Sequence, residues 1–177
     1  MNTRKPMSGI IRGSLCAAVA GVGFIASASV SIADDRLVAE NVSASAGQPA
    51  AVPITIKLGA DNVAFFGATF TVTPQGAAPA IVEKLAYQAA GGSPAPDLQT
   101  AVQADAKLAI GYVGVTISPP LSGTARIGTL TVPIPAGASG TYKVEVSKVS
   151  AGDSSGNKIS ITGQAGTITI GGDTRSR

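Results

Sequence analysis

The chain lacks the side chains on which most enzyme and metal chemistry depends. Its 177 residues include no histidine, no tryptophan and a single cysteine, Cys16, and only 4% of them are aromatic. Without histidine, the usual nucleophile–base pairs of covalent catalysis are missing, and zinc sites built from histidine and cysteine are excluded. We therefore expect no enzyme, no cofactor and no metal site, and we expect the function to reside in a binding surface.

The first 33 residues have the layout of a secretory signal peptide. Basic residues precede an uncharged stretch, 14–33, and the small residues Ser31 and Ala33 stand three and one positions before a predicted cleavage site at Asp34. We predict that residues 1–33 are removed on export to the periplasm or the medium, which leaves no stable membrane span. A membrane anchor is the alternative, but the stretch is rich in Ala, Gly and Ser and only weakly apolar.

Removal of this leader leaves a neutral chain without cysteine. The whole chain has 13 basic and 10 acidic residues, and three of the basic ones lie in 1–33. No excess of positive charge therefore remains for nucleic acid or a membrane surface. Residues 34–170 are enough for one domain with its own core, which must hold together without disulfides. We predict a disordered polar tail over 171–177.

The remaining sequence is dominated by alternation of apolar and polar residues, which is typical of strands with one buried face. In 65–73, Phe70 and Val72 are the first choice for the core, and the threonines between them face the other way. Tyr142 and Val144 alternate with polar residues in the same manner, and Ile168 and Ile170 belong to a last strand. Turns rich in Gly and Pro separate these runs. The pattern predicts an all-β protein, a sandwich of about nine antiparallel strands.

Two segments are less clear in the sequence. Pro53 interrupts the alternating run 52–58 and has no backbone N–H, so we predict an edge strand or the start of a strand there. The segment 80–88 suits either a short helix or a strand.

Four apolar runs in a fixed order resemble the cohesin domain, a secreted β-sandwich with jelly-roll-like topology that holds other proteins. They are the segments 63–73, 108–115, 126–134 and 140–149, and the similarity extends over roughly residues 36–170. Gly67 and Phe70 keep the register of the family's Gly-Phe-x-Phe strand. The resemblance implies a non-catalytic module for protein–protein attachment outside the cytoplasm, with a dockerin-type or other partner and a link to polysaccharide degradation.

The chain departs from the cohesin pattern where cellulosomal cohesins grip dockerins. Gly67 and Thr69 occupy the positions of two gripping polar residues, and Pro74 and Gln75 replace the family's Tyr-Asp pair. The resemblance thus implies that the scaffold is retained while the familiar dockerin contacts are not. We predict instead that the partner binds an exposed row of threonines with Tyr112 and the loop 91–96 nearby; the row comprises Thr69, Thr71 and Thr73.

The alternative from another class is a carbohydrate-binding module, since such modules share this sandwich architecture. Sugars stack on exposed rings, and Phe65 and Tyr87 are the candidate rings. A purely structural exported domain is a third interpretation.

The carboxylates show no spacing that indicates a glycosidase pair, and we interpret them as scattered surface acids. Asp153 opens a polar turn, 153–157, that offers oxygen atoms. Because calcium takes six to eight oxygen ligands and this turn has one acid, a turn capped by its own side chain is favoured over a calcium site.

Overall fold

The computed structural model describes residues 34–91, 93–102 and 106–171. Within these residues the chain forms twelve strands in two sheets and no helix. The predicted leader, 1–33, lies outside the described residues, as does the predicted tail except for Gly171, which ends the last strand. No helix long and apolar enough to span a membrane occurs in the described part of the chain.

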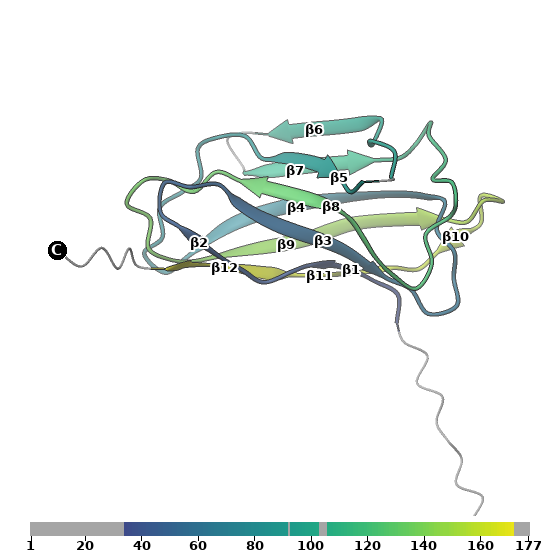
Figure 1. The fold of residues 1–177 in the computed structure, drawn as a ribbon, viewed down its shortest axis with the longest axis horizontal. Helices are drawn as coiled ribbons and strands as arrows, with labels where there is room; N and C mark the ends of the chain where they lie inside the picture. The colour runs from purple at the N-terminus through teal and green to yellow at the C-terminus, as the bar shows by residue number, and fades with distance from the viewer. Residues whose placement is uncertain (1–33, 92, 103–105, 172–177) are drawn as a thin grey trace, which may run out of the picture. The chain divides into compact units, whose positions relative to one another are not determined.

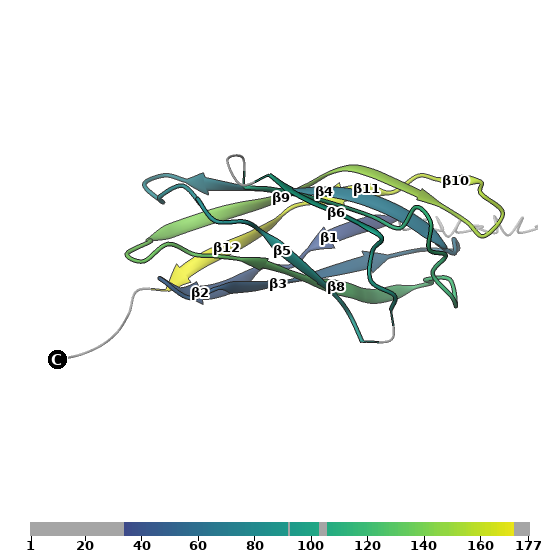
Figure 2. The ribbon, with the colours of Figure 1, turned by 90° about the horizontal axis from the view of Figure 1, so that it is seen from above.

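The two sheets face each other as the layers of a sandwich (Figures 1 and 2). The five-stranded sheet has the order β11-β1-β3-β8-β5. Its strands are β1 (Arg36–Ala39), β3 (Ala50–Lys57), β5 (Ala86–Ala89), β8 (Thr124–Val132) and β11 (Thr162–Gln164).

The seven-stranded sheet has the order β2-β12-β9-β4-β7-β6, and β10 pairs with β9 beside this path. Its strands are β2 (Val42–Ser45), β4 (Phe65–Gln75), β6 (Leu98–Val102), β7 (Lys107–Gly111), β9 (Gly140–Gly152), β10 (Lys158–Ile159) and β12 (Gly166–Gly171). The predicted all-β sandwich is confirmed, with more strands than the expected nine and with two parallel pairs among the antiparallel ones.

The two parallel pairs form one ladder that joins the beginning of the domain to its end. β1 pairs with β11 in the first sheet and β2 pairs with β12 in the second, and every partner lies 126 residues further along the chain, as Thr167 does from Asn41. At the crossing between the sheets the Thr167 amide donates a hydrogen bond of 2.8 Å to the Asn41 side-chain oxygen. The chain passes from β1 to β2 and from β11 to β12 at the same level, so both segments move from the first sheet to the second together. The ladder thereby closes one side of the sandwich.

The core contains the residues that the alternation predicted. Phe70 and Val72 on β4 are buried, as are Tyr142 and Val144 on β9, and Ile168 and Ile170 on β12. Burial of a large apolar side chain contributes roughly 1.5–3 kcal/mol. Burial of one face of each sheet is therefore the main source of stability in a domain without a disulfide.

The prediction that Pro53 marks an edge strand or the start of a strand is wrong. β3 lies inside the five-stranded sheet, between β1 and β8. Pro53 sits where its neighbour β1 has just ended at Ala39, and its carbonyl accepts a hydrogen bond of 3.0 Å from the Glu40 amide. An antiparallel strand turns the N–H and C=O of one residue to the same side, so the missing N–H faces the end of β1.

The segment 80–88 contains no helix and leads into β5. Ile81, Leu85 and Tyr87 are all buried. On the other sheet, the pairing of β4 with β9 shifts between Gly67 and Thr69. Lys148, in the shifted part of β9, has a positive φ of 49°, as expected of a β-bulge residue.

Candidate functional site

The solvent side of the seven-stranded sheet has a regular composition that follows from the pairing of four strands. On β4 and β7 the odd-numbered side chains point outward, and on β6 the even-numbered ones do, because residues paired across strands share a face. β9 contributes Lys143, Glu145 and Ser147 opposite the threonines of β4, and Ser150 opposite Gly67. We call this surface the outer face.

The predicted threonine row lies on the outer face, but it is not exposed along its whole length. Thr73 is exposed, Thr71 is half-buried and Thr69 is only 8% exposed. Thr69 is enclosed between Ala109 of β7 and Ser147 of β9, whose hydroxyl donates to the Thr69 carbonyl at 3.4 Å. The expectation of an exposed Thr69 is therefore wrong, because β4 is a central strand with a neighbour on each side.

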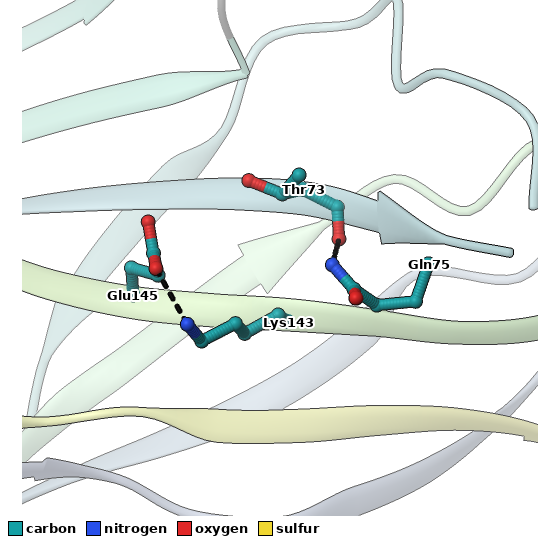
Figure 3. Close-up of polar contacts among 4 residues, drawn as sticks. All are labelled: Thr73, Gln75, Lys143 and Glu145. Atoms are coloured by element: carbon teal, nitrogen blue, oxygen red, sulfur yellow. Dashed lines mark hydrogen bonds and ion pairs between the residues drawn. The ribbon is translucent and has the colours of Figure 1, made fainter.

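A charged pair lies at the Thr73 end of the outer face (Figure 3). The Lys143 ammonium contacts the Glu145 carboxylate at 2.6 Å, and the Gln75 side-chain amide donates to the Thr73 carbonyl at 3.5 Å. Both charged side chains are 47% exposed, so the pair contributes little to stability. It makes this end of the face polar.

The opposite end of the outer face is hollow and mainly apolar. A pocket of about 230 Å³ lies between Phe65, the Gly67 backbone, Val113 and Ser150, with Phe66 and Tyr112 at its base. The rings of Phe66 and Tyr112 lie 4.6 Å apart at an angle of 34°. A Cβ atom on Gly67 would lie 3.3 Å from the Ser150 hydroxyl and 3.4 Å from the Ile110 carbonyl. Glycine at this position thus keeps this pocket open.

Asp97 holds the rim of this pocket in place. Its carboxylate accepts hydrogen bonds from the amides of Val113 at 2.8 Å and Gly114 at 2.5 Å. These backbone hydrogen bonds lower the pKa of Asp97 below its ordinary value. The interpretation as a scattered surface acid missed this role, because no local pattern relates Asp97 to a loop sixteen residues away.

The two tyrosines of the sequence prediction belong to the interior rather than the surface. Tyr112 is 2% exposed and Tyr87 is 6% exposed. The Tyr87 hydroxyl donates to the Ile127 carbonyl at 2.9 Å, and its ring stacks with Phe70 at 6.4 Å. Burial raises the pKa of both tyrosines above the ordinary value. Neither ring offers a free face to a sugar or a partner, and Phe65 alone of the predicted rings is partly exposed.

Two further loops were singled out in the sequence: the turn 153–157, which directly follows β9, and the loop 91–96, which directly precedes Asp97. In the turn 153–157, the Asp153 carboxylate accepts hydrogen bonds of 2.8 Å from the amides of Ser155 and Asn157 and from the Asn157 side chain. These hydrogen bonds lower the pKa of Asp153 and form the capped turn that the sequence favoured. Part of the loop 91–96, Gly92, lies outside the described residues.

No protein-family model matches the chain, and no curated protein matches it in sequence. Solved structures do match it. The OlpA cohesin in complex with the dockerin Doc918 from Clostridium thermocellum has a TM-score of 0.62 and 14% identity, with 77% of this chain and 99% of that chain covered. The non-cellulosomal cohesin of Archaeoglobus fulgidus has a TM-score of 0.59 and 16% identity, with 80% and 94% covered. The third ScaB cohesin of R. flavefaciens, in complex with a group 1 dockerin, has a TM-score of 0.55 and 19% identity, with 81% and 99% covered.

The domain has the cohesin fold.

Within this cohesin-like domain, the departures noted in the sequence fall on the outer face and at its polar end. Gly67 lines the pocket and Thr69 is buried beside it, so the two residues present almost no polar side chain to solvent. Gln75, at one position of the family's Tyr-Asp pair, is exposed at the end of β4, and Pro74 is half-buried. On β4, the side chains available to a partner are therefore Thr71, Thr73 and Gln75, with the charged pair at one end and the apolar pocket at the other.

Proposed function

We propose that the chain is a non-catalytic module that holds another protein outside the cytoplasm through the outer face of its seven-stranded sheet. The observation that carries this proposal is the low, small-residue centre of that face between an apolar pocket and a polar end. Such a surface suits a rigid partner, because backbone can approach closely and apolar and polar groups lie in separate places. Export rests on the predicted leader in 1–33.

A dockerin-type domain is the partner that we propose. The solved structures with the same fold include cohesins in complex with dockerins from several bacteria. We also propose a role in polysaccharide degradation, and what supports it is that a Cel5 dockerin is the partner in one of these complexes. Because Gly67 and Thr69 supply little polar contact, the affinity has to come from Thr71, Thr73 and the pocket beside Phe65.

Titration calorimetry against a panel of purified dockerins tests this proposal. Thr71→Arg places a long charged side chain in the centre of the outer face, and we expect it to weaken binding tenfold or more, which is about 1.4 kcal/mol. Thr131→Arg is the matched control, because Thr131 is also a half-buried strand threonine but lies on β8 in the other sheet. If no dockerin binds and affinity capture from the native medium recovers no stoichiometric protein, the proposal fails.

The carbohydrate-binding alternative has lost one of its two candidate rings, Tyr87, to the core and depends on Phe65. A polysaccharide pull-down decides it. Retention that disappears in Phe65→Ala would support a sugar site at the pocket, and absence of retention in the wild type would exclude one for the sugars tested.

A further inference from the structure

β6 forms one end of the seven-stranded sheet and has a single neighbour. The strand pairs with β7 along its full length, from Leu98 with Gly111 to Val102 with Lys107, and it ends the strand order of the sheet. Figure 1 shows it at the top of the sandwich, with β7 on one side only. Natural proteins commonly protect such an edge with charge, proline or a bulge. The sequence of β6, Leu-Gln-Thr-Ala-Val, has none of these.

The β6 edge also carries apolar side chains that nothing in the described part of the chain covers. Leu98 is 47% exposed and Val102 is 41% exposed, and both point to the outer face. They are two of the four large apolar residues exposed among the described residues. A third, Val113, lies beside Leu98, since both approach the position of a Cβ on Gly111 within 3.5 Å. The strand at the other end of this sheet, β2, exposes no large apolar side chain.

The backbone groups that β6 turns to its free side follow from the pairing of β7. The Tyr112 amide donates to the Phe66 carbonyl at 2.8 Å, so the even-numbered residues at this end of β7 turn their backbone groups toward β4. The odd-numbered residues of β7 then face β6, and they are partners of Leu98, Thr100 and Val102. Backbone direction alternates along a strand. Gln99 and Ala101 therefore present their N–H and C=O groups to the free edge.

We propose that β6 pairs antiparallel with β6 of a second copy of this chain, across a two-fold axis at Thr100. In this register Gln99 is opposite Ala101 of the other copy, so the free backbone groups of both strands pair with each other. Leu98 is opposite Val102 of the other copy in a pair without backbone hydrogen bonds, where side chains approach most closely. All five residues of the strand are paired, and each exposed apolar side chain gains an apolar neighbour from the other copy.

A second copy fits this edge better than an unrelated strand because the register is self-complementary. A two-fold interface brings the same patch of both molecules together, and a strand without charge creates no repulsion when it meets its own copy. The pairing continues the seven-stranded sheet into that of the other copy, and the two outer faces become one surface. This inference does not depend on the proposed partner of the outer face.

Cysteine cross-linking tests the register directly, in a Cys16→Ser background that removes the only natural thiol. Thr100 meets itself at the axis, with Cα atoms about 4.5 Å apart, which is within the range for a disulfide. Thr100→Cys should therefore give a covalent dimer on mild oxidation. Leu98→Cys is the matched control, because the two copies of residue 98 lie about 14 Å apart in this register. Equal cross-linking of both variants, or none at about 1 mM protein, would overturn the proposal.

Sedimentation equilibrium with a second pair of variants tests the free backbone groups. Gln99→Pro removes one N–H from the free edge and leaves the hydrogen bonds to β7 in place, whereas Gln99→Ala keeps that N–H. We expect the wild type and Gln99→Ala to dimerise alike, and Gln99→Pro to dimerise about tenfold more weakly or not at all. Dimerisation that survives Gln99→Pro would show that β6 is not the interface.

Discussion

The carboxylate of Asp97, just before β6, accepts a hydrogen bond of 2.8 Å from the backbone amide of Val113, just after β7. A second hydrogen bond from the Gly114 amide completes a clamp on the loop. Val113 is 75% exposed and forms part of the pocket rim. The clamp thus holds the backbone of Val113 in place, although the Val113 side chain is exposed and has little packing to restrain it.

Acidification should release this clamp at a lower pH than that at which a free aspartate titrates. The hydrogen bonds lower the pKa of Asp97 from its ordinary value of 3.8. A lowered pKa in the folded state means that the contribution to stability is present above the unfolded value and is lost as the pH falls through the folded value. We expect the amide resonances of Val113 and Gly114 to shift with a midpoint below pH 3.8, as measured by NMR titration.

Asp97→Asn is the control for this titration. Asparagine keeps one acceptor oxygen and carries no charge, so the acid transition of the Val113 and Gly114 amides should disappear and their exchange with solvent should accelerate at neutral pH. A wild-type midpoint at or above 3.8 would show that the hydrogen bonds do not form in solution.

Gly166 is the residue that allows the parallel ladder to cross between the sheets. A Cβ atom there would overlap the backbone carbonyls of Ala39 and Glu40. We expect Gly166→Ala to lower the free energy of unfolding by about 1–3 kcal/mol, because crowded backbone cannot move aside at low cost. Chemical denaturation measures this as a lower midpoint with an unchanged slope. Gly91→Ala is the control: a Cβ there meets nothing within 4 Å, so its effect should stay within about 0.5 kcal/mol.

The sequence predicted the strands that carry strong alternation and missed the relationships between distant segments. Burial of Phe70 and Tyr142 follows from a local period of two, because one face of each strand meets the other sheet. The ladder from β1 and β2 to β11 and β12 joins residues 126 positions apart, and nothing in four-residue strands identifies a parallel partner at that distance. The prediction for Pro53 failed for the same reason. A central strand can hold a proline where the neighbouring strand has ended, and the local sequence does not show where that strand ends.

The sequence identified the strand and the face that carry the candidate binding residues, but not which of those residues are exposed to solvent. Alternation places Thr69, Thr71 and Thr73 on one side of β4, and they are there. Whether a side chain on that side reaches solvent depends on the neighbouring strands, which enclose Thr69. Tyr87 carried a usable signal, because it shares its parity with Leu85, which is buried. Asp97 carried none.

Lys148 should tolerate glycine better than valine. Its φ of 49° lies in the left-handed region, which is unfavourable for residues with a Cβ and worst for β-branched ones. We expect Lys148→Val to lower the free energy of unfolding by about 1–2 kcal/mol, and Lys148→Gly to leave it unchanged or raise it. Glu145→Gly, at a regular position of the same strand, should cost about 0.5–1 kcal/mol. A loss of stability in Lys148→Gly as large as in Glu145→Gly would contradict the left-handed backbone conformation of Lys148 at the bulge.

Tyr87→Phe separates a structural role of the ring from a role in sugar binding. The variant loses the hydrogen bond to the Ile127 carbonyl, but that carbonyl also accepts one from the Ala90 amide at 3.0 Å. The cost should therefore stay near 0.5–1.5 kcal/mol, because no buried acceptor is left without a partner. Equilibrium unfolding measures this loss, and any polysaccharide retention should stay unchanged.

The same variant gives a test at high pH. Burial raises the pKa of Tyr87 above its ordinary value of 10, so the unfolded chain loses this proton before the folded chain does. A raised pKa in the folded state contributes stability that is present below the unfolded value and is lost as the pH rises above it. The wild type should therefore lose stability more steeply above pH 10 than Tyr87→Phe does, in unfolding curves measured at a series of pH values. Curves that fall in parallel would mean that the Tyr87 hydroxyl is accessible to water in the folded protein.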